Sequence, residues 1–229
     1  MLYIVATPIG NLQDITLRAL ETLKTVDKIY CEDTRRTRQL LSAFAIHKPV
    51  FSLHHHSPDT VIETIRCAVE AGENIAYVTD AGTPGIADPG GKLVERLRET
   101  LGYEKITAIP GPSAVTALLS VAGIPANSFR FVGYVPTKKG RETFIKTILQ
   151  DPDPVVFFET APRFLKLLDQ LVALGGEKRT LMVGRELTKK FEQLAYGNPA
   201  ELKTDFADPK GEFVVVLVPA NFVTKHLDA

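Results

Sequence analysis

Short apolar runs alternate with segments of helical periodicity through the first half of the chain. Such runs predict strands, and they cover Leu2–Ala6, Lys28–Cys31, Val50–Leu53, Ile75–Thr79 and Ile106–Ile109. Apolar residues at helical spacing predict helices near Asp14–Lys24, Arg35–Phe44, Pro58–Ala71 and Gly91–Leu101. Asp14 and Asp59 are the expected helix starts, and Gly72 and Gly102 are the expected ends. Strands that alternate with helices are typical of βα units, so we predict a mainly parallel sheet.

The pattern changes after the Pro-Gly-Pro corner within Ile109–Ser113, which we interpret as the domain boundary. Beyond it, helices are predicted at Ala114–Ala122, Arg141–Leu149 and Pro162–Leu174. Strands are predicted at Phe129–Val132, Val155–Phe158, Thr180–Gly184, Gln193–Tyr196 and Phe213–Val218. Because we expect little helix between the last two strands, we predict a mixed sheet in this half.

The composition is that of an ordinary globular protein, and it limits the kinds of partner. Hydrophobic residues make up 45% of the 229 positions, which is enough for one large or two smaller packed domains. The 27 basic and 27 acidic side chains give a formal charge of zero, so the whole molecule is not a diffuse polyanion binder. Any contact with nucleic acid must therefore come from local clusters of charge.

Cysteine usage and hydropathy indicate a reducing environment without a membrane. Cys31 and Cys67 have no CxxC spacing, so we expect two buried free thiols rather than a disulfide or a metal site. No apolar stretch approaches the length of a membrane span, and no basic segment precedes the first strand. We therefore expect a cytoplasmic protein with no anchor.

Three loops rich in glycine or proline follow predicted strands, and they cover Thr7–Gly10, Asp80–Gly85 and Pro110–Ser113. Ligands of open α/β sheets bind at the carboxyl ends of the strands, where glycine lets the backbone approach closely. A Walker loop ending at Lys92 would need Gly at Ile86, and no GxGxxG motif follows the first strand. The loops suit a ligand with an amino-acid end and a flat base, such as S-adenosylmethionine. For the Asp80 loop, a purely structural turn is the alternative.

Charged and histidine side chains follow the second and third predicted strands. Glu32 and Asp33 would face the same sheet edge as the loops, and capping of the next helix by Asp33 or Thr34 is an equal alternative. Among His54, His55 and His56 only the first and third could share a metal ion, because extended side chains alternate faces. Without a nearby cysteine or an HExxH motif we expect no metal, and instead a hydrogen bond to a polar substrate or simple exposure.

Two short basic runs complete the candidate chemistry: Arg35, Arg36 and Arg38, and Lys138, Lys139 and Arg141. Runs of this kind are usually solvated faces. If both runs face one cleft, we expect them to hold phosphates while an aromatic side chain, such as Tyr134 or Phe51, stacks on a base.

Nine stretches, in order along nearly the whole chain, carry a family resemblance. They are LYIVATPIGNLQDITLRALETLK (2–24), EDTR (32–35), SLHHH (52–56), VTDAGTPGIADPG (78–90), AIPGPSAVTALL (108–119), FVGYVP (131–136), FFET (157–160), GRELTKKFE (184–192) and KGE (210–212). With them the chain resembles the tetrapyrrole-methylase-like, class III S-adenosylmethionine-dependent methyltransferases. Within that family it is similar to the subgroup that methylates the ribose 2′-hydroxyl of a cytidine in the decoding region of 16S rRNA.

The resemblance implies two α/β domains, residues 1–113 and 114–229, with a mainly parallel sheet in the first and a mixed sheet in the second. It implies a homodimer and a cleft between the domains that holds S-adenosyl-L-methionine. The residues that would contact the cofactor are Pro8, Asp80, Gly82, Thr83, Ile86, Ser113 and Ala114 from the first domain, and Glu159, Thr160 and the Arg185–Thr188 stretch with Leu187 from the second.

For the reaction, the resemblance makes Glu32 the first choice of proton acceptor, with Asp33 and His54 as alternatives. The residues that would contact 16S rRNA, within the 30S subunit, are Thr34, Arg35, His56, Lys138 and Lys139. Two departures from the subgroup concern RNA binding. Ser57-Pro58 stands where Asn-Glu is usual, and the chain stops at Ala229 where many members continue with a helical extension. We therefore carry over no RNA contact at Ser57-Pro58, and we expect whatever the extension contributes to RNA binding to be absent or replaced.

Two other functions remain open from the sequence. One is a tetrapyrrole methyltransferase acting on carbon, although that group carries GDP-type glycine motifs where this chain has Asp80–Pro84. The other is a relative without catalysis that binds only the cofactor or RNA, against which the intact EDTR and RELTK stretches argue.

Overall fold

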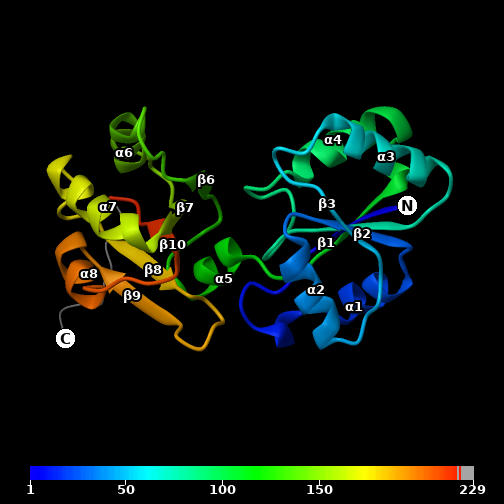
Figure 1. Ribbon diagram of the computed structural model, residues 1–229. Helices are drawn as coiled ribbons and strands as arrows, with labels where there is room; N and C mark the ends of the chain where they lie inside the picture. Colours follow the sequence, from blue (N-terminus) through cyan, green and yellow to red (C-terminus); the bar gives the residue numbers. More distant parts are fainter. Residues whose placement is uncertain (221, 223–229) are drawn as a thin grey trace. The chain divides into compact units, whose positions relative to one another are not determined.

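The computed structural model describes residues 1–220 and 222 of the chain (Figure 1). The chain divides after Ser113 into two compact units, each with its own sheet and core. The first unit contains a five-stranded sheet of order β3-β2-β4-β1-β5, and the second a five-stranded sheet of order β6-β7-β10-β8-β9.

All neighbouring strands of the first sheet are parallel. The strands are β1 (Leu2–Val5), β2 (Lys28–Cys31), β3 (Val50–Ser52), β4 (Ile75–Val78) and β5 (Ile106–Ile109). They are linked by α1 (Leu17–Thr25), α2 (Thr34–Ala43), α3 (Asp59–Glu70) and α4 (Gly90–Leu101), with short 3-10 turns at Leu12–Asp14 and Tyr103–Lys105. The predicted parallel sheet is confirmed, and its carboxyl edge collects the loops that follow β1, β2, β4 and β5.

Helices cover both faces of this sheet (Figure 1). On one face Leu23 of α1 and Leu41 of α2 pack with strand residues such as Val78. On the other face Ile65 of α3 and Leu97 of α4 pack with Tyr77 and its neighbours. Burial on both sides explains why all four residues of β4 are buried and why its sequence is a continuous apolar run.

The sheet of the second unit is mixed, as predicted. Its strands are β6 (Arg130–Tyr134), β7 (Val155–Thr160), β8 (Leu181–Arg185), β9 (Gln193–Gly197) and β10 (Glu212–Leu217). Only β6 and β7 pair in parallel, and the other pairs are antiparallel. The helices α6 (Arg141–Leu149), α7 (Ala161–Ala173) and α8 (Pro199–Asp205) build a core on one face, whereas α5 (Ala114–Val121) places Leu118 over Gly184 on the other.

Three details of the sequence interpretation are wrong. The first helix begins at Leu17 and not at Asp14, because the Thr16 hydroxyl accepts the hydrogen bond from the backbone N–H of Ala19. A helix, α8, does lie between the last two strands, and its start carries a capping box formed by Asn198 and Glu201. Cys31 is buried as expected, but Cys67 is exposed because it lies on the outer side of α3.

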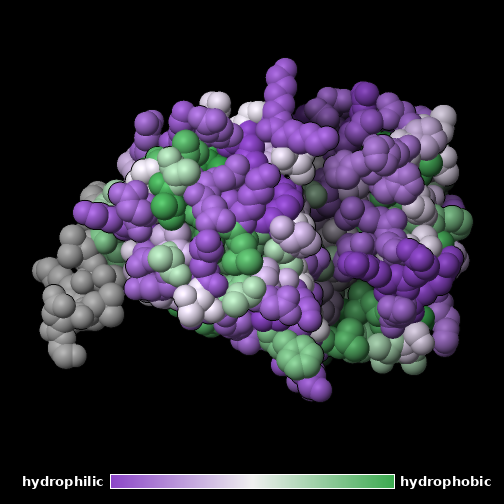
Figure 2. All heavy atoms as spheres, turned by 60° about the vertical axis from the view of Figure 1, so that its left-hand side comes forward, coloured by the Kyte–Doolittle hydropathy of each residue, from purple (hydrophilic) through white to green (hydrophobic). Residues whose placement is uncertain are grey.

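Helix length and the hydropathy of one face of the molecule describe its surface. In the part of the chain that the structure describes, no helix is both long and apolar enough to span a bilayer. The face drawn in Figure 2 is mainly hydrophilic, and its hydrophobic residues form small separate patches. Scattered hydrophobic residues of this kind are ordinary on a globular surface.

Candidate active site

Loops at the carboxyl edge of the first sheet are joined to one another by hydrogen bonds. Thr7, just after β1, and Gly82, after β4, exchange two backbone bonds of 2.9 and 3.0 Å. The hydroxyl of Thr83 donates to the carbonyl of Pro112, after β5, at 3.0 Å. The structure thus brings together the three loops that the sequence singles out, although they are far apart along the chain.

Glycine is required where these loops meet. Gly82 has a φ of +85°, and a Cβ there would lie 3.3 Å from Ile9 Cγ2. A Cβ on Gly111 would lie 2.9 Å from the Cβ of Ala6. Beside them, Gly91 at the start of α4 faces open space. The loops are therefore packed closely against one another while part of their backbone stays uncovered.

Asp88 orders the long loop that leads into α4. Its carboxylate accepts hydrogen bonds from the backbone N–H of Ile86 at 3.0 Å and of Gly90 at 2.7 Å. Between them Ala87 has a φ of +65°, a conformation that costs energy for a residue with a side chain. Ile86 is exposed. A strained loop held by a dedicated carboxylate, with an apolar side chain outside, is typical of a ligand-binding segment.

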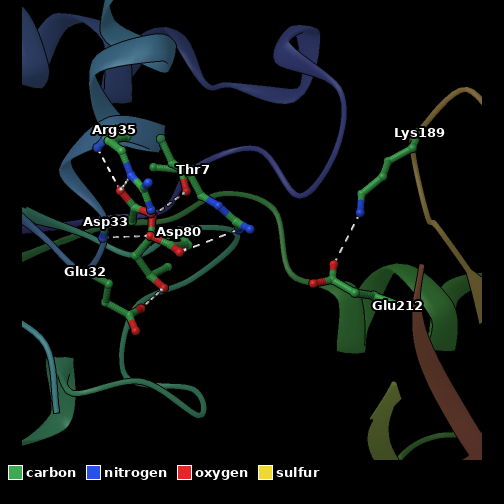
Figure 3. Close-up of polar contacts among 9 residues, drawn as sticks. Thr7, Glu32, Asp33, Arg35, Asp80, Lys189 and Glu212 are labelled. Carbon is green, nitrogen blue, oxygen red and sulfur yellow. Dashed lines mark hydrogen bonds and ion pairs between the residues drawn. The ribbon is translucent and has the colours of Figure 1, made fainter. Parts of the chain in front are cut away.

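Glu32 follows β2, and its carboxylate has one hydrogen-bond donor in the described chain. The hydroxyl of Thr79, after β4, donates to Glu32 Oε1 at 2.7 Å, and Figure 3 draws this contact as the dashed line at Glu32. Thr79 is buried, whereas Glu32 is partly exposed. The glutamate therefore has a fixed orientation and an oxygen left to accept another hydrogen bond.

Asp33 and Asp80 also lie at this edge, and their carboxylates have different partners. Asp33 caps α2 through the backbone N–H of Arg35 at 2.8 Å and pairs with the Arg35 guanidinium at 3.0 Å. Hydrogen bonds from the Arg35 side chain and backbone lower the pKa of Asp33 to about 2. Asp80 accepts from the backbone N–H of Asp33 at 3.0 Å and lies 3.6 Å from Arg36 Nη1. The capping alternative is confirmed for Asp33, which makes it a weak proton acceptor.

The three histidines lie in an exposed turn after β3. His54 Nδ1 accepts from the backbone N–H of His56 at 3.1 Å, and the two imidazole rings are 6.2 Å apart between centroids. Among the described residues, no cluster of histidine, cysteine and carboxylate side chains could hold a metal ion. Ser57, at the first departure from the subgroup, holds this turn because its hydroxyl accepts from the backbone N–H of His54.

Glu159 in the second unit is buried, and both oxygens of its carboxylate have partners within the unit. It lies 3.3 Å from Arg141 Nη1 and 3.2 Å from Arg163 Nη2. Its other oxygen accepts from the backbone N–H of Thr160 at 2.9 Å. A side chain held in this way stabilises the start of α7, so a cofactor contact by Glu159 would have to come from its backbone.

Leu187 lies in a turn of unusual backbone conformation after β8. Its neighbours Glu186 and Thr188 have φ values of +51° and +64°. Leu187 is buried against the bare backbone of Gly184, where a Cβ would lie 2.8 Å from Leu187 Cδ2. Lys189 stabilises the turn by pairing with Glu186 at 2.8 Å and with Glu212 at 3.2 Å, and Figure 3 shows the second of these pairs. Strain of this kind persists only where surrounding contacts enforce it, and it is common at ligand clamps.

An aromatic cluster on β6 and β7 adjoins the predicted basic run. Phe158 of β7 contacts Tyr134 and Phe131 of β6, with ring centroids 5.4 and 5.0 Å apart. Tyr134 is 51% exposed. In the loop that follows, Lys138 and Lys139 are exposed and have no carboxylate partner among the described residues, whereas Arg141 is buried against Glu159. The two lysines are therefore free to meet an anion, and Arg141 is not.

The remaining predicted cofactor residues lie at or just beyond strand ends within their own units. Pro8, Ser113, Ala114 and Thr160 are partly exposed at the ends of β1, β5 and β7. Thr34 is the first residue of α2 and accepts from Arg38 Nη1 at 3.4 Å. Sequence reasoning missed the roles of Thr79, Thr7 and Asp88. Asp88 carried a signal, because an Asx residue two positions before a helix start is a common turn former.

Comparison with known proteins identifies the family. The family model of tetrapyrrole (corrin/porphyrin) methylases matches residues 1–203. The chain is 44% identical over 221 residues to ribosomal RNA small subunit methyltransferase I of Xylella fastidiosa, covering 94% of this chain and 80% of that protein. It is 45% identical over 222 residues to the protein of the same name from Escherichia coli O157:H7, covering 94% and 77%.

A solved structure shares the fold at low sequence identity. Uroporphyrin-III C-methyltransferase from Thermus thermophilus, complexed with S-adenyl homocysteine, superposes with a TM-score of 0.62 at 17% identity, covering 95% of this chain and 96% of that one. The chain therefore belongs to the tetrapyrrole methylase family, together with the relatives named ribosomal RNA small subunit methyltransferase I, and is an S-adenosylmethionine-dependent methyltransferase.

Proposed function

We propose that this enzyme transfers a methyl group to the ribose 2′-hydroxyl of a cytidine in the decoding region of 16S rRNA, within the 30S subunit. The observation that carries the proposal is the identity of 44% and 45%, across 94% of the chain, to proteins named for methylation of small-subunit ribosomal RNA. The porphyrin methyltransferase that shares the fold is only 17% identical. The RNA substrate is therefore favoured over a tetrapyrrole.

The loops of the first unit suit the cofactor through their backbone. Gly82 and Gly111 keep the strand-tip loops close together, and Gly91 leaves open space beside the start of α4. Pro8, Asp80, Thr83, Ile86 and Ser113 lie in these loops and are proposed to hold the cofactor, with Ala114, at the start of α5, Thr160 and Leu187 contributing from the second unit. When bound, S-adenosylmethionine supplies an electrophilic methyl group on a sulfonium.

Glu32 is proposed to accept the proton of the ribose hydroxyl. Its carboxylate is partly exposed and accepts from one donor in the part of the chain that the structure describes, whereas Asp33 is engaged by Arg35 and the helix cap. A general base contributes about 10²- to 10⁴-fold to such a rate. Alignment of the two reactants contributes more, on the order of 7–11 kcal/mol. The main task of the protein is therefore orientation, and His54 is the alternative base.

RNA contacts are proposed for local clusters, because the net charge is zero. Arg35 is 85% exposed and Thr34 begins α2 beside it, so both can meet a phosphate near Glu32. His56 lies in the exposed turn after β3. In the second unit, Lys138 and Lys139 would bind phosphates while the exposed ring of Tyr134 stacks on a base. A homodimer is proposed on the family resemblance alone.

A transfer assay with radiolabelled S-adenosylmethionine tests this function. The substrates are 30S subunits from a strain that lacks the modification, naked 16S rRNA, and uroporphyrinogen III. We expect label in the 30S subunits and none in the porphyrinogen. Label in the porphyrinogen alone would establish the tetrapyrrole alternative, and cofactor binding without transfer to any substrate would indicate a non-catalytic relative.

A further inference from the structure

Glu32 and Thr79 are neighbours because of the strand order of the first sheet. β2 and β4 pair in parallel with Cys31 opposite Val78, so the residues that follow each strand lie side by side at the carboxyl edge. The Thr79 hydroxyl donates to Glu32 Oε1 at 2.7 Å, and Thr79 is only 7% exposed. This contact is a buried hydroxyl aimed at a carboxylate that reaches the surface.

We propose that Thr79 is a positioning residue for methyl transfer and acts by orienting the carboxylate of Glu32. The inference rests on the proposed function, in which Glu32 accepts the proton. One hydrogen bond fixes Oε1, and Oε2 stays available to the substrate hydroxyl. A free glutamate side chain samples several rotamers, so a single fixed donor raises the share of productive orientations.

Thr79 is itself held in place, which is what a positioning residue requires. Its carbonyl accepts from the buried hydroxyl of Thr7 at 3.3 Å. Thr7 is in turn fixed by its two backbone bonds to Gly82. Threonine is also stiff about χ1 because two heavy atoms branch from Cβ. The hydroxyl is therefore locked to the same loop that we propose for the cofactor.

No other described residue replaces the Thr79 hydroxyl as hydrogen-bond donor to the Glu32 carboxylate. Tyr77, two residues earlier on the same face of the sheet, is fully buried and its hydroxyl has no hydrogen-bond partner among the described residues. Burial, together with the charges of Asp88 and Glu32, raises the pKa of Tyr77 far above its ordinary value. In the described chain no donor other than Thr79 reaches the Glu32 carboxylate.

The test compares Thr79→Val, which removes the hydroxyl at nearly constant volume, with Thr79→Ser, which keeps it. Single-turnover methylation of 30S subunits at saturating cofactor should fall about 10- to 100-fold in Thr79→Val, as expected for loss of a hydrogen bond to a charged group. Thr79→Ser should restore most of the rate, and the cofactor Kd and the KM for 30S should change little. Thr22→Val is the matched control, because Thr22 is equally buried and donates within α1, to the carbonyl of Arg18.

A double-mutant cycle with Glu32→Gln shows whether Thr79 acts through the glutamate. If it does, Thr79→Val causes no further loss in the Glu32→Gln background. A full additional loss there, or a Thr79→Val rate equal to that of the wild type, would overturn the inference while leaving the proposed function intact. Failure of the wild type to methylate 30S subunits would instead refute the proposed function. Urea unfolding of each variant identifies a loss caused by misfolding, and Thr79→Ala then repeats the test with a smaller side chain.

Discussion

Two glutamates at strand ends, one in each unit, show how environment decides what a carboxylate does. Glu32 follows β2, is partly exposed, and accepts one hydrogen bond from a neutral hydroxyl. Glu159 lies near the end of β7, is 1% exposed, and faces two guanidinium groups. The carboxylate of Glu32 can therefore still accept a hydrogen bond from a substrate, whereas that of Glu159 is fully paired within the fold.

The contrast explains why sequence position alone is a poor guide to a catalytic carboxylate. Both glutamates lie at strand ends, in stretches that carry the family resemblance. Their partners differ, since Arg141 and Arg163 neutralise Glu159, whereas Thr79 is the one donor to the Glu32 carboxylate among the described residues. A buried charge that loses its partners destabilises the fold, whereas an exposed carboxylate can be changed without such a cost.

The largest effect is expected from Glu32→Gln. The substitution keeps the shape of the side chain and removes the proton acceptor, so the single-turnover rate constant should fall about 10²- to 10⁴-fold. The cofactor Kd, measured by calorimetry, and the urea midpoint should stay close to the wild-type values. An unchanged rate constant would exclude Glu32 as the base and leave His54 to be tested in the same way.

Glu159→Ala should show the opposite behaviour. Removal of this carboxylate leaves two arginines without their buried partner, so the free energy of unfolding should fall by about 3–5 kcal/mol. Asp169→Ala is the control, because the exposed pair of Asp169 with Lys203, at 2.6 Å, should contribute about 1 kcal/mol or less. Equal losses in the two variants, measured by urea denaturation, would show that Glu159 is not a structural anchor.

Gly82→Ala tests the strand-tip loops themselves. A side chain at a φ of +85° costs about 1–2 kcal/mol, and its Cβ would press on Ile9, so the cofactor Kd should rise about 10-fold. Gly72→Ala is a matched control, because Gly72 has a φ of +95°, a Cβ there would meet no atom within 4 Å, and it lies away from the site. It should lower stability similarly and leave the Kd unchanged. A raised Kd in both variants would assign the effect to general strain.

The smallest effect is expected from Lys138→Ala combined with Lys139→Ala. Loss of two phosphate contacts should weaken 30S binding and reduce the slope of log K against log salt concentration by about 0.7–0.9 per lysine. Lys178→Ala is the control, because Lys178 is exposed and precedes β8 at the opposite end of the sheet. An unchanged slope would remove this run from the RNA-binding surface.

Much of the fold was predictable from local pattern. The strands of the first unit and the parallel sheet followed from alternating apolar runs and helical segments. The start of the first helix was not predictable in this way, since Asp14 and Thr16 are both good caps and the local sequence does not distinguish them. The missed helix α8 did carry a signal, because Asn198 and Glu201 form a recognisable capping box and Pro199 stands at the first helical position.

The site was predictable only at the level of loops. That loops after parallel strands share one edge follows from topology, and it led to Glu32 and Gly82. The partner of Glu32 did not follow, because Thr79 is 47 residues away and the contact depends on β2 lying beside β4. Likewise, nothing local distinguishes Arg141, which is buried, from the exposed lysines two and three residues earlier.

The most direct test of the central claim is the chemical identity of the methylated nucleoside. After transfer from labelled S-adenosylmethionine to unmodified 30S subunits, the 16S rRNA is digested to nucleosides and separated by liquid chromatography with mass detection. The proposed role of Glu32 requires a hydroxyl that gives up a proton, so the label should appear in 2′-O-methylcytidine. Label on a base carbon or ring nitrogen, with none on ribose, would contradict it.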